Sequence, residues 1–264
     1  MNVRLWLLFP LALATVTVSL AQVPDPSATS RSYLEADGSL QPVWFICDAV
    51  NAPTVAVVGQ PDGARRTRIT VYSKSRPGTH GYNTYTVGPA DPGAGQVYYS
   101  LRLRAEDASS GDYLHAFNPG MFDPPGAALT PTFTSVRLGG DTLACRWVAN
   151  TRLMGFTTRR SVLVTETAPG VLTYETFDFG DAATAKQLQP DGVQQTSTPS
   201  LRIEGGTRRI TPALEIFTFS NAGYTYQVQV ARQGQPAQAS LTVSYGGRAL
   251  QTERLTGYTY AERP

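Results

Sequence analysis

One segment decides the fold class: Gln96-Val-Tyr-Tyr-Ser-Leu-Arg-Leu-Arg-Ala105, in which apolar and polar side chains alternate. Successive side chains of a strand point to opposite faces, so this segment presents one apolar row and one wet row. The apolar row comprises Val97, Tyr99, Leu101 and Leu103. The same alternation recurs in residues 68–73, 142–150, 161–167, 172–179, 224–231 and 240–245. These segments predict a chain built almost wholly of β-strands.

Glycine pairs stand at three expected strand ends, Gly139-Gly140, Gly205-Gly206 and Gly246-Gly247. Two-residue hairpin turns need positive φ angles, which glycine adopts at little cost. The last pair lies within a series of four strand-like segments, 216–219, 224–231, 239–245 and 249–255. We therefore expect an all-β fold of antiparallel sandwich or barrel-like sheets, with Gly-Gly hairpins and a C-terminal β-meander.

The N-terminus has the pattern of a secretory signal peptide. A short basic start ending at Arg4 precedes an apolar stretch, and Ser19-Leu20-Ala21 supplies small residues before a cleavage point. The pattern predicts a signal peptide over residues 1–21 and export to the periplasm or the exterior. Residues 22–32 are expected to be a disordered mature N-terminus. No integral membrane segment is expected in the mature chain.

The two cysteines, Cys47 and Cys145, both follow or lie within apolar, aromatic strand segments. An oxidising compartment allows them to pair. Phe45 shares a strand face with Cys47, and Trp147 shares one with Cys145, so we expect a buried disulfide packed against aromatic rings.

A polar stretch rich in Gln, Thr and Ala divides the chain at residues 180–199. We expect a β-sandwich-like domain with one disulfide over residues 33–179, a linker over 180–199 and a small antiparallel β-meander domain over 200–264. A unit this small is marginal alone. The alternative left open is that both β regions share one continuous core.

Several classes of chemistry lack their usual residues. The formal net charge is +2, too small a basic excess for a nucleic-acid partner. No Gly-x-Ser-x-Gly occurs, and the two histidines stand in unrelated loops, so no catalytic residue and no metal site is assigned. No cofactor is expected. Calcium remains an alternative because oxygen-bearing residues gather in one irregular region: Asp107, Asp112, Asn118 and Asp123.

Three carboxylates, Glu166, Glu175 and Asp178, lie on consecutive strands of an expected hairpin. Glycoside hydrolysis needs two carboxyl groups on either side of a bond, and these residues are the candidates for that role. The favoured interpretation is that they are solvent-facing strand residues.

Aromatic residues are dense between Arg68 and Phe117, among long glycine-rich loops. Tyrosine on the wet face of a sheet offers stacking surface, although cross-strand packing uses it as well. Binding is expected through the loops 75–85, 88–95 and 107–126 or through an aromatic sheet face. The candidate ligand-binding residues are Tyr72, His80, Tyr82, Tyr98, His115 and Asn118.

The expected function is that of a non-enzymatic exported protein that binds a protein, a glycan or an envelope component. One alternative is an extracytoplasmic polysaccharide hydrolase. The other is an inhibitor of a secreted hydrolase, since the segments Phe45–Cys47 and Ala94–Tyr99 are similar to parts of the membrane-bound lysozyme inhibitors. That similarity covers a few residues of a longer chain, so no family is assigned.

Overall fold

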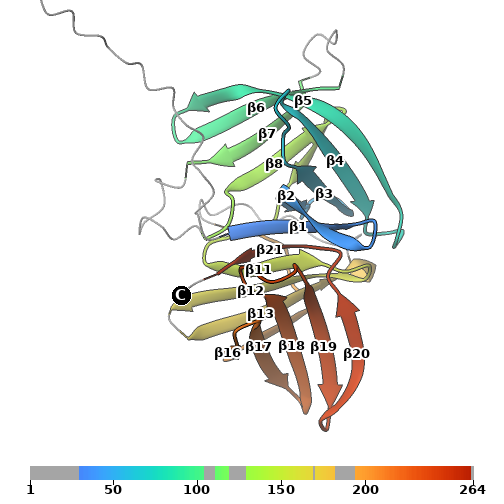
Figure 1. Cartoon of the computed structure of the whole chain (residues 1–264), viewed down its shortest axis with the longest axis vertical. Coiled ribbons are helices and arrows are strands. Elements are labelled where there is room, and N and C mark those ends of the chain that lie inside the picture. The colour runs from blue at the N-terminus through green and yellow to red at the C-terminus, as the bar shows by residue number, and fades with distance from the viewer. Residues whose placement is uncertain (1–29, 104–110, 119–128, 169, 182–193, 263–264) are drawn as a thin grey trace, which may run out of the picture.

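The computed structural model describes residues 30–103, 111–118, 129–168, 170–181 and 194–262. These residues form antiparallel β-strands, with one short 3₁₀ turn at Phe179–Asp181 (Figure 1). The expected all-β fold class is confirmed. Within the described ranges no helix has the length and apolarity needed to cross a membrane. The expected signal peptide lies outside the described residues.

One large sheet contains fourteen strands. Nine of them follow one another in the sequence: β1 (Ser30–Ala36), β2 (Ser39–Asp48), β3 (Thr54–Gly59), β4 (Arg66–Ser73), β5 (His80–Gly93), β6 (Gln96–Arg102), β7 (Tyr113–Phe117), β8 (Phe133–Leu138) and β9 (Asp141–Ala144). The others are β11 (Thr151–Phe156), β12 (Arg160–Ala168), β13 (Val171–Asp178), β15 (Leu201–Glu204) and β21 (Gly257–Ala261). The order across the sheet is β15-β13-β12-β11-β21-β1-β2-β3-β4-β5-β6-β7-β8-β9.

The part of this sheet from β2 to β9, here called the curled half, bends until its two ends meet (Figure 1). An isolated bridge joins Ala49 to Cys145, and the Val50 amide donates to the Ala144 carbonyl at 2.8 Å. The expected disulfide between Cys47 and Cys145 crosses the same seam, with the two Cα atoms 4.6 Å apart. A single bridge rather than a ladder connects the ends, so the sheet does not close into a barrel.

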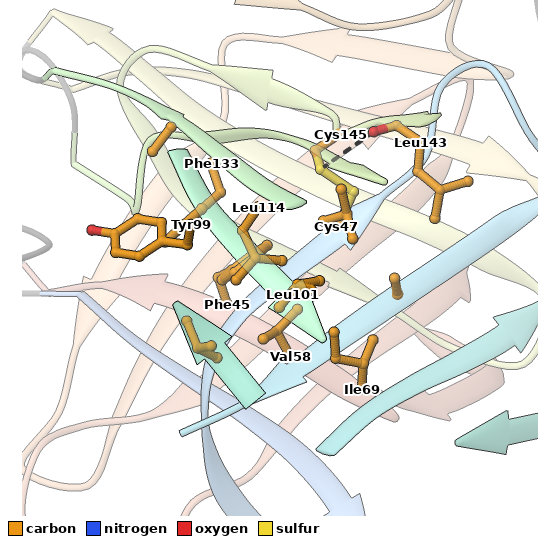
Figure 2. Close-up of a cluster of buried hydrophobic side chains, with 14 of the residues drawn as sticks. Phe45, Cys47, Val58, Ile69, Tyr99, Leu101, Leu114, Phe133, Leu143 and Cys145 are labelled. Atoms are coloured by element: carbon orange, nitrogen blue, oxygen red, sulfur yellow. Dashed lines mark hydrogen bonds between the residues drawn. A yellow bond between two sulfur atoms is a disulfide. The ribbon is translucent and has the colours of Figure 1, made fainter. Parts of the chain in front are cut away.

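The concave side of the curled half is apolar (Figure 2). Phe45 and Phe133 stack there with ring centroids 3.8 Å apart. Val97, Tyr99 and Leu101 are buried as the alternation predicts, but Leu103 lies beyond the end of β6 and is 43% exposed. The alternation therefore identified the inner face correctly as far as the strand extends.

A second sheet of five strands packs on the other end of the large one. It contains β16 (Thr207–Ile210), β17 (Leu214–Asn221), β18 (Tyr224–Ala231), β19 (Ala239–Tyr245) and β20 (Arg248–Arg254). The last four are the predicted C-terminal meander. This sheet shares a buried cluster with β11–β13, β15 and β21, and together they are called the packed half.

The C-terminal strand β21 lies between β1 and β11 in the large sheet. Residues on both sides of the expected 180–199 boundary thus contribute to one buried cluster. Most of the expected linker, residues 182–193, lies outside the described residues. Gln194–Gln195 forms a short strand, β14, paired with β10 (Trp147–Val148). Strand β1 begins at Ser30, inside the range expected to be disordered.

Two of the three glycine pairs form the expected hairpin turns. Gly139-Gly140 joins β8 to β9 and Gly246-Gly247 joins β19 to β20, all with positive φ. The expectation of a hairpin at Gly205-Gly206 was wrong, because this pair carries the chain from β15 in one sheet to β16 in the other. A Cβ atom on Gly206 would overlap the ring of Phe219, so close packing explains that glycine.

Candidate functional site

A buried ion cluster holds the turn of the β4–β5 hairpin, because Lys74 directly follows β4. The Asp48 carboxylate contacts the Lys74 ammonium at 2.5 Å and accepts a hydrogen bond from Arg146 Nε at 2.7 Å. Lys74 Nζ also donates to the Ala49 carbonyl at 2.6 Å. Burial acts to raise the pKa of Asp48, but attraction by Lys74 and Arg146 outweighs it and lowers that pKa to about 2. Burial lowers the pKa of Lys74.

Arg146 extends this cluster toward the packed half. Its guanidinium lies 3.3 Å from the ring centroid of Phe177 on β13. Its Nη atoms donate to the hydroxyls of Thr196 and Ser197 at 2.7 and 3.1 Å. Through Lys74 and Asp48, the turn between β4 and β5 is therefore tied to the seam at Arg146.

An open space of about 770 Å³, here called the hollow, lies at the mouth of the curled half. Its walls come from the β4–β5 hairpin, the β8–β9 turn and the connection between β2 and β3. Apolar side chains on the concave face contribute Ile69, Val71, Tyr85 and Leu138. Polar lining is contributed by Ser73, Arg76, Thr79, His80 and Asn83. The hollow thus combines an apolar floor with a rim that carries one arginine.

Three of the six predicted binding residues, Tyr72, His80 and Tyr82, line this hollow. Their side chains lie on the face of the hairpin opposite the floor residues, so they border the hollow and do not form its floor. Tyr72 and His80 stack with ring centroids 5.0 Å apart. The Arg68 guanidinium lies 3.5 Å from the ring centroid of Tyr82, which is 58% exposed.

Tyr72 and His80 also border a second, smaller groove of about 220 Å³. Phe156 and Phe179 line its other side, where the curled half meets the packed half. Tyr72 contacts Phe156 with centroids 5.2 Å apart. Burial raises the pKa of Tyr72, so its hydroxyl stays neutral and the groove has an apolar, aromatic lining.

Tyr98 and His115 form a separate cluster on the convex side of β6 and β7. Their rings stack with centroids 4.5 Å apart, and Tyr113 meets Tyr98 edge-on at 5.4 Å. His115 shares hydrogen bonds with Gln96 Oε1 at 3.0 Å and Thr134 Oγ1 at 3.1 Å. Burial lowers the pKa of His115. Most polar atoms of this histidine are engaged within the sheet.

The sixth predicted residue, Asn118, follows β7, where its amide donates to the Gly95 carbonyl at 2.8 Å. Two further tyrosines from the same dense region, Tyr85 and Tyr99, are core residues. Burial raises the pKa of Tyr99 to about 12. The sequence-predicted residues therefore divide between the hollow and the β6–β7 cluster.

Four residues were considered for calcium, and the structure describes two of them, Asp112 and Asn118. Asp107 and Asp123 lie outside the described residues. Asp112 is buried and accepts a weak hydrogen bond from the Gly140 amide at 3.5 Å. In the described part of the chain, no three His, Cys, Asp or Glu side chains are grouped closely enough to hold a metal ion.

The three candidate hydrolytic carboxylates each contact an arginine. Glu166 pairs with Arg152 at 2.7 Å, Glu175 with Arg202 at 3.0 Å and Asp178 with Arg160 at 3.4 Å. Glu166 and Glu175 are buried, although the sequence interpretation placed them toward solvent. The packing of the second sheet on β12 and β13 covers the face that carries Glu166. Glu175 lies on the opposite face, with Leu163 and Phe177, which belong to a different buried cluster.

Sequence reasoning missed the fully buried Arg152, whose guanidinium lies between Glu166 and Glu215. Arg208 and the Tyr260 hydroxyl also donate to the Glu215 carboxylate. The available signal was the single charge in each of two otherwise apolar strands, 151–156 and 214–219. Arg76 and Asn83 of the hollow carried no such signal, because their role depends on strands distant in sequence.

Comparison of the chain with protein-family models, with curated proteins and with solved structures finds no match.

Proposed function

We propose that this chain is an exported, non-enzymatic binding protein and that the hollow is its binding site. The observation that carries the proposal is an apolar floor and a polar rim gathered at one opening of a rigid sheet. Ligand sites combine a mostly apolar lining with a few polar groups that orient the ligand. Because most of the lining residues lie on strands, the site is largely preformed.

The lining chemistry defines the class of ligand. Ile69, Val71 and Leu138 offer apolar contact, while Arg76 is the one formally charged residue among those that line the hollow. An anionic or neutral group beside an apolar one matches this surface. A protein segment or a glycan chain carries both kinds of group, and either fits an exported protein.

Export itself is part of the proposal. The disulfide between Cys47 and Cys145 fits an oxidising compartment, either the periplasm or the exterior. Mass spectrometry of the protein recovered from culture supernatant and periplasmic extract is expected to show a chain that begins at Gln22. A chain recovered in the cytosol with Met1 retained would contradict export.

The binding proposal is tested with arrays of oligosaccharides and of peptides probed with the labelled mature chain. Asn83→Trp places a large ring in the hollow, and Asn221→Trp makes the same change in an exposed hairpin of the second sheet. We expect array binding by the wild type and by Asn221→Trp, and at least tenfold weaker binding by Asn83→Trp. Binding that is absent, or that Asn83→Trp leaves unchanged, would remove the hollow as the site.

The hydrolase alternative has less support, since Glu166, Glu175 and Asp178 each pair with an arginine. A guanidinium occupies carboxylate oxygens that a substrate would use. None of the three lines the hollow.

A further inference from the structure

We infer that the hollow takes an extended segment of a partner protein, which adds as a strand to the edge of β5 that faces away from β4 at residues 80–85. This inference rests on the proposed function and names the class of ligand. Strand β5 pairs with β4 through residues 80–86 and with β6 from residue 86 onward. Among the described residues, no strand covers the second edge of residues 80–85.

The hydrogen-bond register shows which backbone groups this edge presents. The Ser73 amide donates to the Thr79 carbonyl, and the Val87 amide donates to the Arg65 carbonyl. Hydrogen-bonded pairs recur at every second residue of an antiparallel ladder, so residues 81, 83 and 85 also direct their polar groups toward β4. The N–H and C=O groups of His80, Tyr82 and Thr84 therefore point away from β4, along the open edge.

This edge lacks the usual protection against a further strand. Natural edge strands carry charged residues, prolines or bulges that block pairing. The segment His80-Gly-Tyr-Asn-Thr-Tyr85 contains no Lys, Arg, Asp, Glu or Pro. Residues 80–84 are all exposed. The bulge of β5 lies further along the strand, between Val87 and Ala90.

The two sides of the hairpin then receive alternate side chains of an added strand. Side chains directed inward meet the hollow, with its floor at Ile69 and Val71. Side chains directed outward lie beside the exposed ring of Tyr82. In strand addition, backbone bonds supply affinity and such alternating contacts supply specificity.

Charge favours an acidic segment over a second copy of this chain. Arg68 flanks the edge on the convex side and Arg76 lines the hollow. No carboxylate lines the hollow. A second copy would bring the same cations to this edge, whereas a segment with an apolar residue and a nearby Asp or Glu complements it.

The probe is a phage-displayed library of random twelve-residue peptides, selected on the wild type and counter-selected on Asn83→Trp. Selected peptides are then synthesised and measured by calorimetry. Thr84→Pro removes one edge N–H, while Thr84→Ala changes the side chain and keeps that N–H; proline is tolerated on strand edges. We expect about tenfold weaker binding for Thr84→Pro and less than about twofold change for Thr84→Ala.

Amide hydrogen exchange on the unmodified protein supplies a readout that needs no variant. A bound peptide should newly protect the amides of His80, Tyr82 and Thr84, because only these gain partners. The amides of residues 81, 83 and 85 are already bonded to β4 and should change little. Protection at alternate residues would support strand addition even where Thr84→Pro fails to fold.

The outcomes separate the two proposals. A peptide that binds in the hollow without protecting the three edge amides overturns strand addition and leaves the hollow as a site. If a glycan binds and no peptide is selected, strand addition is likewise overturned and the hollow remains a site. If wild-type chains dimerise and Thr84→Pro abolishes the dimer, the occupant is a second copy and the inferred partner is wrong. Failure of both arrays and library overturns both proposals.

Discussion

The curled half and the packed half each bury a cluster of charges, but with opposite composition. In the curled half one carboxylate, Asp48, lies between the cations Lys74 and Arg146. In the packed half one buried cation, Arg152, lies between the carboxylates Glu166 and Glu215. The first cluster adjoins the disulfide at a seam of a single sheet. The second is enclosed between two sheets.

The difference follows from how the interior of each half is filled. Two facing sheets fill the space between them, as Tyr174 and Phe219 do with ring centroids 5.3 Å apart. A single sheet that bends back on itself has no second layer, so its ends are held by a cross-link and by charges. Its mouth remains open, and the hollow is found there. The candidate site is thus a consequence of the curled geometry.

Loss of the disulfide should have the largest effect. The double variant Cys47→Ala/Cys145→Ala frees a loop closed at a sequence separation of 98, and we expect a loss of about 4 to 5 kcal/mol in unfolding free energy. Urea unfolding followed by tryptophan fluorescence measures it, since Trp44 and Trp147 are the tryptophans after residue 21. Wild type treated with reductant is the matched control. A loss below about 1 kcal/mol would show that the seam does not depend on its cross-link.

Removal of the central cation of the packed half should have the next largest effect. Arg152→Met leaves Glu166 and Glu215 buried with fewer partners, and breaking a buried pair costs about 3 to 5 kcal/mol. We expect about 3 kcal/mol, because Arg208 stays on Glu215. Arg202→Met is the control, as Arg202 is half-exposed and should cost less than about 1 kcal/mol. Equal losses of unfolding free energy for Arg152→Met and Arg202→Met in urea titrations would contradict the difference expected between a buried and a half-exposed arginine.

Acid should weaken the curled half through Asp48. The pKa of this group in the folded chain is about 2, below its ordinary value of 3.8, so its stabilisation is complete above pH 3.8 and is lost as the pH falls through 2. The shift corresponds to about 2 kcal/mol. We expect the wild type to lose this amount between pH 4 and pH 2 in urea titrations. The matched variant Asp48→Asn should show a flatter dependence, and parallel curves would exclude this role of Asp48.

The smallest effect is expected at the β6–β7 cluster. Tyr98→Ala removes the stack on His115 and the edge contact with Tyr113, which should cost about 0.5 to 1.5 kcal/mol in unfolding free energy. Binding on the peptide and glycan arrays should not change. A loss of array binding larger than that of Asn83→Trp would move the site to this convex face.

The sequence predicted the local elements well because side-chain alternation depends only on neighbours. Val97 and Leu101 lie inside, the meander from residue 216 onward is present, and Cys47 pairs with Cys145. Partners distant in sequence were not predictable in this way. The strand at residues 257–261 was not predicted, and neither was its insertion between β1 and β11.

For the same reason, the sequence grouped residues that the structure divides between the hollow and the β6–β7 cluster. Tyr72, His80 and Tyr82 were grouped with Tyr98 and His115 because all lie in one stretch of sequence, and the bend of the sheet separates them. Leu138 enters the hollow from β8, more than fifty residues away from the hairpin. Only the curvature of the sheet brings that contact about, and no local pattern encodes it.

The position of β21 has a consequence for the order of folding. Its partner β1 lies at the beginning of the described chain, with Tyr33 opposite Tyr258. Contacts of such sequence separation slow folding, because a long loop must close before they form. Until residue 261 has been synthesised, β1 and β11 each lack a neighbour and the sheet stays incomplete. Late completion of the sheet is compatible with the export proposed above, because a translocation channel accepts an incompletely folded chain.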